Sequence, residues 1–174
     1  MRTFLASAAV ATILCFGQQS SVPAQNNNAT AELRISGDVA TPLTLSASDL
    51  KKMARQTLKV VNPHEKKEET YEGVAVQDLL RRAGVPQNEK LRGAWMATYV
   101  VGEASDGYRV VYSLAELDSD FQDSNVIVAD TLNGSPLGEK QGPFKMVAPH
   151  DKRPARWIRM LKSLTVLTAA PGKP

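Results

Sequence analysis

The stretch YEGVAVQDLLRRAG, residues 71–84, decides how this chain folds. Its apolar positions are spaced i, i+3, i+4 and i+7, the pattern of one buried helix face: Val76, Leu79, Leu80 and Ala83. Gly84 stands where a glycine commonly follows a helix C-cap, and Pro86 stops any continuation. The stretch therefore predicts a short amphipathic helix that begins near Val76 and ends before Gly84.

Strand patterns lie on both sides of this helix. Alternation or an apolar run bounded by turn residues is typical of strands, and it occurs at residues 32–36, 56–61, 95–102, 108–112, 125–129, 144–148 and 163–168. Asp106–Gly107 and Asn133–Gly134 predict tight turns between them. About seven short strands with two or three short helices indicate the α+β fold class, with a mixed β-sheet.

Two capping patterns predict where the other helices begin. Ser46 is a good N-cap, and Asp49 three residues later favours the exposed amides of a first turn. Ser113 and Glu116 have the spacing of a capping box and predict a short helix through Leu117. Residues 62–70 are charged and predict a loop that contains His64.

Residues 1–24 are typical of a Sec-type signal peptide. Arg2 supplies the positive start, Phe4 to Gly17 an apolar stretch too short to span a bilayer, and Ala24 a small residue for cleavage. Leu14 before Cys15 disfavours a lipoprotein signal, and the lone Arg2 disfavours a twin-arginine signal. We expect a periplasmic or secreted protein with no transmembrane segment after cleavage.

The expected mature chain has 150 residues, 174 minus 24, which is one ordinary domain. We expect a disordered leader at 25–30, a single domain at 31–168 and a frayed tail at 169–174. The sole cysteine of the sequence, Cys15, lies in the signal segment. The mature chain would therefore have no thiol for a disulfide, a metal or nucleophilic catalysis.

Charge is unevenly distributed along the chain. Residues 103–139 hold eight acids and one base, whereas residues 140–174 hold eight bases and one acid. This pattern indicates either two solvated faces of opposite sign or an anion-binding surface in the C-terminal third. No nucleic acid is expected, because aromatic residues are sparse and no nucleic-acid motif is present.

The order of several short motifs resembles a known family. They are, in chain order, Gly37, Pro42, Leu45, Ser46, Asp49 and Leu50; Tyr71 to Val74, Asp78 to Leu80, Ala83 and Gly84; Asp106 to Tyr108, Ser113, Leu114 and Glu116; Ala129, Asp130, Gly134, Pro136 and Leu137; Gln141 to Pro143, Met146, Val147 and Pro149; and Arg156 to Ile158. Together they resemble the molybdopterin-binding domain of sulfite-oxidase-type oxidoreductases, in a short single-domain form.

The resemblance implies a molybdenum cofactor whose metal is held by a cysteine thiolate. That cysteine would lie between a strand and the helix start, within residues 58–71, and this interval contains none. A histidine–glycine pair of the family corresponds to Gln141 and Gly142, and two basic contacts correspond to Lys145 and Arg156. The basic groups therefore partly persist, while the histidine and the thiol do not.

The resemblance and the charge pattern nominate six cofactor- or ligand-binding residues, listed in chain order: Tyr108, Gln141, Gly142, Lys145, Arg153 and Arg156. Lys152 and Arg159 extend the basic group, since guanidinium and ammonium groups suit phosphate, sulfate or carboxylate oxygens. The alternative for Arg156 and Arg159 is ion pairing with the acidic stretch. No catalytic set and no metal site is identified; His64 and His150 are expected to be loop residues.

Two main functional hypotheses follow, and a purely structural envelope domain with no ligand is a third. In the first, the protein is a non-catalytic binding or accessory module whose partner is an anionic small molecule or another envelope protein. In the second, it is a periplasmic molybdopterin-dependent oxidoreductase of the sulfite oxidase type, or one subunit of it. The cofactor is left undetermined: the resemblance implies molybdopterin, but the mature chain supplies no cysteine ligand for its metal.

Overall fold

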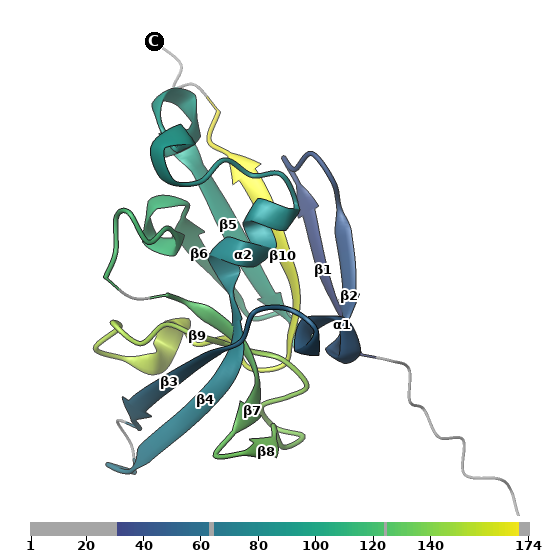
Figure 1. The fold of residues 1–174 in the computed structure, drawn as a ribbon, viewed down its shortest axis with the longest axis vertical. Helices are drawn as coiled ribbons and strands as arrows, with labels where there is room; N and C mark the ends of the chain where they lie inside the picture. Colours follow the sequence, from purple (N-terminus) through teal and green to yellow (C-terminus); the bar gives the residue numbers. More distant parts are fainter. Residues whose placement is uncertain (1–30, 63–64, 124, 171–174) are drawn as a thin grey trace, which may run out of the picture.

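The computed structural model describes residues 31–62, 65–123 and 125–170 (Figure 1). The predicted signal peptide and leader lie outside the described residues, as do His64 and residues 171–174. In the part of the chain that is described, no helix is long and apolar enough to cross a membrane.

The first of two β-sheets, sheet A, has the strand order β2-β1-β10-β5-β6. These strands are β1 (Glu32–Gly37), β2 (Leu43–Ser46), β5 (Thr98–Ala104), β6 (Arg109–Ser113) and β10 (Leu161–Thr168). β1 and β10 are parallel, with Arg34 opposite Ser163, while the other neighbours are antiparallel. Sheet A is therefore mixed, as the sequence predicts.

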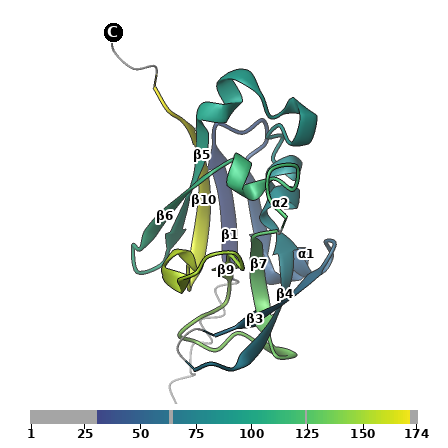
Figure 2. The same ribbon diagram turned by 90° about the vertical axis from the view of Figure 1, so that its left-hand side faces the viewer.

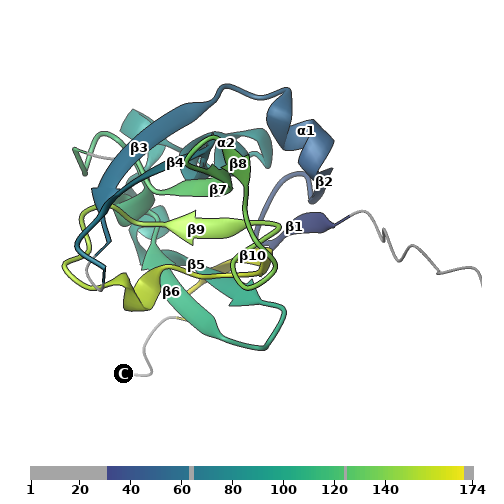
Figure 3. The same cartoon turned by 90° about the horizontal axis from the view of Figure 1, so that it is seen from below.

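The second sheet, sheet B, is antiparallel and has the order β3-β4-β7-β8, with β9 also paired to β7. Its strands are β3 (Gln56–Val61), β4 (Glu68–Ala75), β7 (Ile127–Leu132), β8 (Ser135–Pro136) and β9 (Lys145–Val147). Seen from below, β9 runs between β7 and the strands β5 and β10 of sheet A (Figure 3). Met146 N donates to Ile158 O at 2.8 Å and thereby links β9 to the segment that precedes β10.

The predicted helix is confirmed as α2 (Val76–Arg82), which lies beside sheet A (Figure 2). Its four predicted apolar positions are all buried, and Gly84 adopts a φ of 83° just after the helix. The capping box at Ser46 and Asp49 is also present and begins α1 (Ala47–Lys51). Local sequence patterns thus determine both helices.

Four 3-10 helices complete the described elements: η1 (Asn88–Lys90), η2 (Gly93–Ala97), η3 (Ala115–Leu117) and η4 (Pro154–Arg156). Ser113 Oγ accepts the Glu116 amide and Glu116 Oε2 accepts the Ser113 amide, so the predicted box forms around η3. Trp95 was predicted to start a strand, but it lies in η2. The predicted loop at 62–70 also ends early, because β4 begins at Glu68.

A bulge in sheet B explains why residue 73 is a glycine. Gly73 pairs with Ala129 and Glu72 with Thr131, so Asp130 is the extra residue on β7. A Cβ on Gly73 would stand 2.1 Å from the carbonyl oxygen of Val128. Asp130, the extra residue of the bulge, is buried, and its carboxylate accepts hydrogen bonds from both terminal nitrogens of Arg55 at 2.6 and 2.8 Å.

The core has two parts that meet at one tryptophan. The larger part is packed between sheet A, α2 and one face of sheet B, and the smaller consists of Tyr71, Ile127, Ala129 and Val147 in sheet B. Trp157 packs against both. Burial of these apolar side chains supplies most of the favourable free energy of folding, and it fixes Trp157 at the junction.

Candidate functional site

A cleft of about 860 Å³ opens at this junction. Four chain segments line it: Asn62 and Glu69 from the β3–β4 hairpin; Asp106 and Tyr108 from the β5–β6 turn; Gln141 and Lys145; and residues 152–155, 157 and 159. Its charged side chains are four cations and two carboxylates. The excess of positive charge makes the cleft suitable for anions.

Lys145 lies at the base of the cleft and is only 7% exposed. Its Nζ donates to Tyr71 Oη and to Gln141 Oε1, each at 2.7 Å. It also lies 4.6 Å from the ring centre of Tyr71 and 5.5 Å from that of Trp157. These contacts hold the amine in one position, and the two rings favour its charged form.

Tyr71 connects the lysine to a carboxylate. Its hydroxyl accepts from Lys145 and donates to Glu69 Oε2 at 2.8 Å, while Glu69 Oε1 accepts from Asn62 Nδ2 at 2.8 Å. Its ring packs edge-on against Trp157. Burial, together with the hydrogen bond to Glu69, raises the pKa of Tyr71, so the hydroxyl stays protonated.

Burial has the opposite effect on the lysine. It lowers the pKa of Lys145 to about 8, since a charged ammonium is costly away from water. The carboxylate of Glu69 opposes this shift, and the positive charge of Arg159 reinforces it. Lys145 therefore changes its charge near neutral pH, where an exposed lysine would not.

The rim of the cleft carries three more cations. Lys152, Arg153 and Arg159 are all exposed and line the cleft. None of the three forms an ion pair with a residue that the structure describes. Their charges thus remain available to an anion that enters the cleft.

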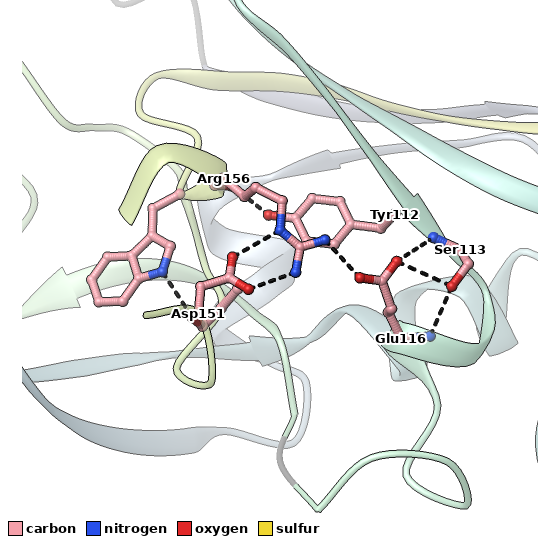
Figure 4. A network of polar contacts seen from close by, with 7 residues as sticks. Tyr112, Ser113, Glu116, Asp151 and Arg156 are labelled. Carbon is pink, nitrogen blue, oxygen red and sulfur yellow. Dashed lines mark hydrogen bonds and ion pairs between the residues drawn. The ribbon is translucent and has the colours of Figure 1, made fainter. Parts of the chain in front are cut away.

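Arg156 is arranged differently, as Figure 4 shows. Its Nε and Nη2 donate to the two oxygens of Asp151 at 2.9 and 2.5 Å, and its Nη1 donates to Glu116 Oε1 at 2.6 Å. Its guanidinium lies 4.8 Å from the ring centre of Tyr112, whose hydroxyl donates to the Arg156 carbonyl oxygen. These contacts join η4 to the end of β6 and to η3.

The ion pairs of Arg156 shift the pKa values of the groups involved. Hydrogen bonds to Asp151, and then to Glu116, raise the pKa of the Arg156 guanidinium. Burial would raise the pKa of Glu116, but hydrogen bonds from Arg156 and Ser113 more than offset it, and the pKa lies below its usual value. The arginine is therefore neutralised by two carboxylates within its own domain.

The structure brings four of the six nominated residues together in the cleft: Tyr108, Gln141, Lys145 and Arg153. Gly142, next to Gln141 in the chain, is buried, but it is packed against Leu137, where a Cβ would stand 2.9 Å from both the Leu137 Cβ and the Leu137 carbonyl oxygen. Arg156 lines a separate pocket of about 240 Å³ together with His150. Arg156 thus forms an ion pair with Glu116 in the acidic stretch, residues 103–139, which is the alternative to ligand binding given above for this arginine.

Sequence reasoning missed Glu69 and Tyr71 as parts of the site. Tyr71 is quoted only in the stretch that leads into the helix and among the family motifs, and Glu69 only as part of a charged loop. Lys145 is 74 residues from Tyr71 along the chain, so their contact depends on the pairing of β4 and β9 with β7. The alternation of β4 was the one available signal, because it places Glu69 and Tyr71 on the same face.

The described residues offer few side chains that could bind a metal ion together. They contain no cysteine, and no three His, Cys, Asp or Glu side chains among them cluster as a metal site would require. The donors that converge on the cleft are ammonium, guanidinium, amide and hydroxyl groups. Such donors suit oxyanions rather than cations.

Comparison with known proteins agrees with this fold. Residues 19–173 match the family described as "Oxidoreductase molybdopterin binding domain". The structure is similar to the crystal structure of the sulfane dehydrogenase SoxCD from Paracoccus pantotrophus, with a TM-score of 0.61 and 20% sequence identity. That similarity covers 78% of this chain and 37% of the other, so this chain spans little more than a third of its length. No curated protein sequence matches this chain.

Proposed function

Because this chain belongs to the oxidoreductase molybdopterin binding domain family, we propose that it is a non-catalytic member that binds an anionic ligand in the cleft above Lys145. One observation carries this proposal: three exposed rim cations without ion-pair partners in the described residues line the same cleft as a buried lysine. A cluster of like charges is unfavourable unless solvent or an anion compensates it. An anionic ligand would supply that compensation.

The residues present fit only part of the family's cofactor. The described residues contain no cysteine whose thiolate could hold a molybdenum ion. Only two carboxylates, those of Glu69 and Asp106, line the cleft. An anionic organic group, by contrast, fits the cationic rim. The proposed function therefore involves no metal-dependent step.

The lining residues have distinct roles in this proposal. Arg153 and Arg159 offer guanidinium forks that match two oxygens of a carboxylate, sulfate or phosphate. Lys145 and Gln141 lie deeper and would contact a second polar group of the ligand. Trp157 forms part of the wall of the cleft. Each charge-assisted hydrogen bond to the ligand would contribute about 1.5–3 kcal/mol where water is excluded.

The proposal includes an extracytoplasmic location, supported by the signal-like residues 1–24. The ligand is then a small anion of that compartment, or an acidic segment of another envelope protein. The exposed rim is accessible to either, whereas the buried Lys145 is reached only by a small group.

Anion binding is tested by calorimetric titration of the full chain with sulfate and with inorganic phosphate at low salt. Arg153→Glu and Arg159→Glu should each weaken binding at least about tenfold, equivalent to about 1.4 kcal/mol. Arg92→Glu is the matched control, since Arg92 is exposed and lies outside the cleft lining. Equal weakening by all three variants, or binding that no variant weakens, would refute the cleft as the site.

The family match also favours a second candidate function, a molybdopterin-dependent oxidoreductase or a subunit of one. Protein purified from its native host is assayed for molybdenum and tungsten, and for fluorescent pterin after acid oxidation. Near-stoichiometric metal would replace the non-catalytic proposal with the redox one. Pterin without metal would identify the anionic ligand as a pterin.

A further inference from the structure

Lys145 differs from every other cation of the cleft in its chemistry as well as its position. The rim cations are exposed, whereas Lys145 is buried beneath them between Tyr71 and Trp157. A hydrogen-bond acceptor, Gln141 Oε1, and a hydroxyl, Tyr71 Oη, both lie 2.7 Å from its Nζ. A primary amine is thus fixed below a group of charges that would hold an anion.

We propose that the cleft captures small carboxylates that also carry an aldehyde or ketone, through an imine between Lys145 Nζ and the carbonyl carbon. The inference rests on the proposed function, because Arg153 and Arg159 must hold the carboxylate of the ligand. With the carboxylate at the rim, the carbonyl on the neighbouring carbon would have to reach Nζ at the base of the cleft. The ligand class is therefore the 2-oxo acids and their aldehyde analogues.

Imine formation requires an uncharged amine, and the burial of Lys145 provides one although the rings of Tyr71 and Trp157 favour the charged form. An ordinary lysine has a pKa near 10.4, so only about 0.1% of it is uncharged at pH 7.5. Burial lowers the pKa of Lys145 to about 8, which leaves roughly a quarter of it uncharged at that pH. Of the charged groups near Nζ, Glu69 on β4 opposes this effect, and Arg159 before β10 supports it.

The step balances without an oxidant or a reductant. Nζ forms a bond to the carbonyl carbon, the carbon–oxygen bond breaks, and the oxygen leaves as water with both hydrogens of the neutral amine. Tyr71 lies within hydrogen-bond reach of Nζ and is backed by Glu69, so its hydroxyl can pass a proton between nitrogen and oxygen. An amine and a carbonyl become an imine and water.

The test is reductive trapping on the full chain. Glyoxylate or pyruvate is added with sodium cyanoborohydride at pH 7.5, and labelled lysines are identified by peptide mass spectrometry. We expect saturable labelling, with Lys145 modified at least about tenfold faster than any other lysine, given its larger uncharged fraction. Lys145→Arg should abolish this fast labelling, whereas Lys90→Arg, at an exposed position outside the cleft, should not change it.

A neutral aldehyde separates amine reactivity from recognition of the carboxylate. Arg153→Glu should slow trapping of glyoxylate at Lys145 by about tenfold or more and leave trapping of propanal within about twofold, because only glyoxylate carries a charge for the rim. Trapping of both probes at similar rates in the wild-type protein would overturn the role of the rim. Labelling spread evenly over exposed lysines would overturn the inference as a whole.

Calorimetry with sulfate distinguishes the two possible failures. If sulfate binds in a manner sensitive to Arg153→Glu but Lys145 is not trapped, this inference is wrong and the proposed function stands. If sulfate does not bind and Lys145 is not trapped, the proposed function is wrong as well.

Discussion

Replacing Lys145 with methionine should change how the stability of the protein depends on pH. The side chain is 7% exposed, and burial lowers its pKa to about 8 from an ordinary value of 10.5. The folded protein then binds fewer protons at this site than the unfolded chain does between these two values. The free energy of unfolding must therefore rise as pH increases through this interval.

The magnitude follows from the pKa values. The cost of the buried charge is fully present below pH 8 and is relieved as pH rises towards 10.5. For one group with this shift, the free energy of unfolding increases by about 2.5 kcal/mol between pH 7 and pH 10. The increase is about 1.5 kcal/mol when partial solvent screening is allowed for. Lys145→Met lacks the titrating group, so its stability should not show this gain.

Urea unfolding followed by the fluorescence of Trp95 and Trp157 measures the effect. The free energy of unfolding is determined for wild type and Lys145→Met at pH 7 and pH 10, and the wild-type value minus the variant value is compared. This difference should increase by about 1.5–2.5 kcal/mol at the higher pH. Lost hydrogen bonds contribute similarly at both pH values and cancel. A difference that stays constant or decreases would refute the desolvation argument.

Other predictions concern the scaffold. Gly73→Ala should destabilise the protein by about 3 kcal/mol or more because its Cβ would stand 2.1 Å from a backbone oxygen, whereas Gly138→Ala, in open space, should stay within about 0.5 kcal/mol in the same urea assay. Arg156→Gln should cost about 1–2 kcal/mol at pH 7, since it breaks a bidentate contact and a second ion pair. The pKa of Glu116 is lowered in the folded state, so the stabilisation that depends on this shift is present above pH 4.5 and lost below it. The cost of Arg156→Gln should therefore shrink in acid, and a cost that is unchanged at pH 3.5 would contradict this reading.

Much of the fold could be predicted because its local signals are strong. The spacing from Val76 to Ala83 fixed the face of α2, and Ser46 with Asp49 fixed the start of α1. Such elements depend on residues within one or two turns of each other. The α+β class and the mixed sheet followed from the same kind of pattern.

The division into two sheets was not predictable in this way. Strand patterns do not specify partners, and β7 pairs with β4, about 55 residues before it, as well as with β8 and β9. The strand pattern at residues 95–102 includes Trp95, but Gly93 with a φ of 62° begins a 3-10 helix that contains this residue. Long-range pairing and a single positive φ both override local propensity.

The site was predictable in its charge and not in its geometry. Lys145, Arg153 and Arg156 belong to one basic segment, but only the structure separates an available guanidinium at Arg153 from a neutralised one at Arg156. The buried contacts of Lys145 are made to Tyr71 through the pairing of distant strands. A sequence presents these three cations as equivalent, although their surroundings assign them different chemistry.

The parallel pairing of β1 with β10 has a consequence for the order of events during folding. β10 lies between β1 and β5, so sheet A has no continuous centre until residues 161–168 have joined it. Until then β1 and β5 lack the neighbour that joins them, and contacts such as Arg34 with Ser163 require closure of a loop of well over a hundred residues. The chain therefore cannot complete this domain one part at a time, and its folding depends on its last strand.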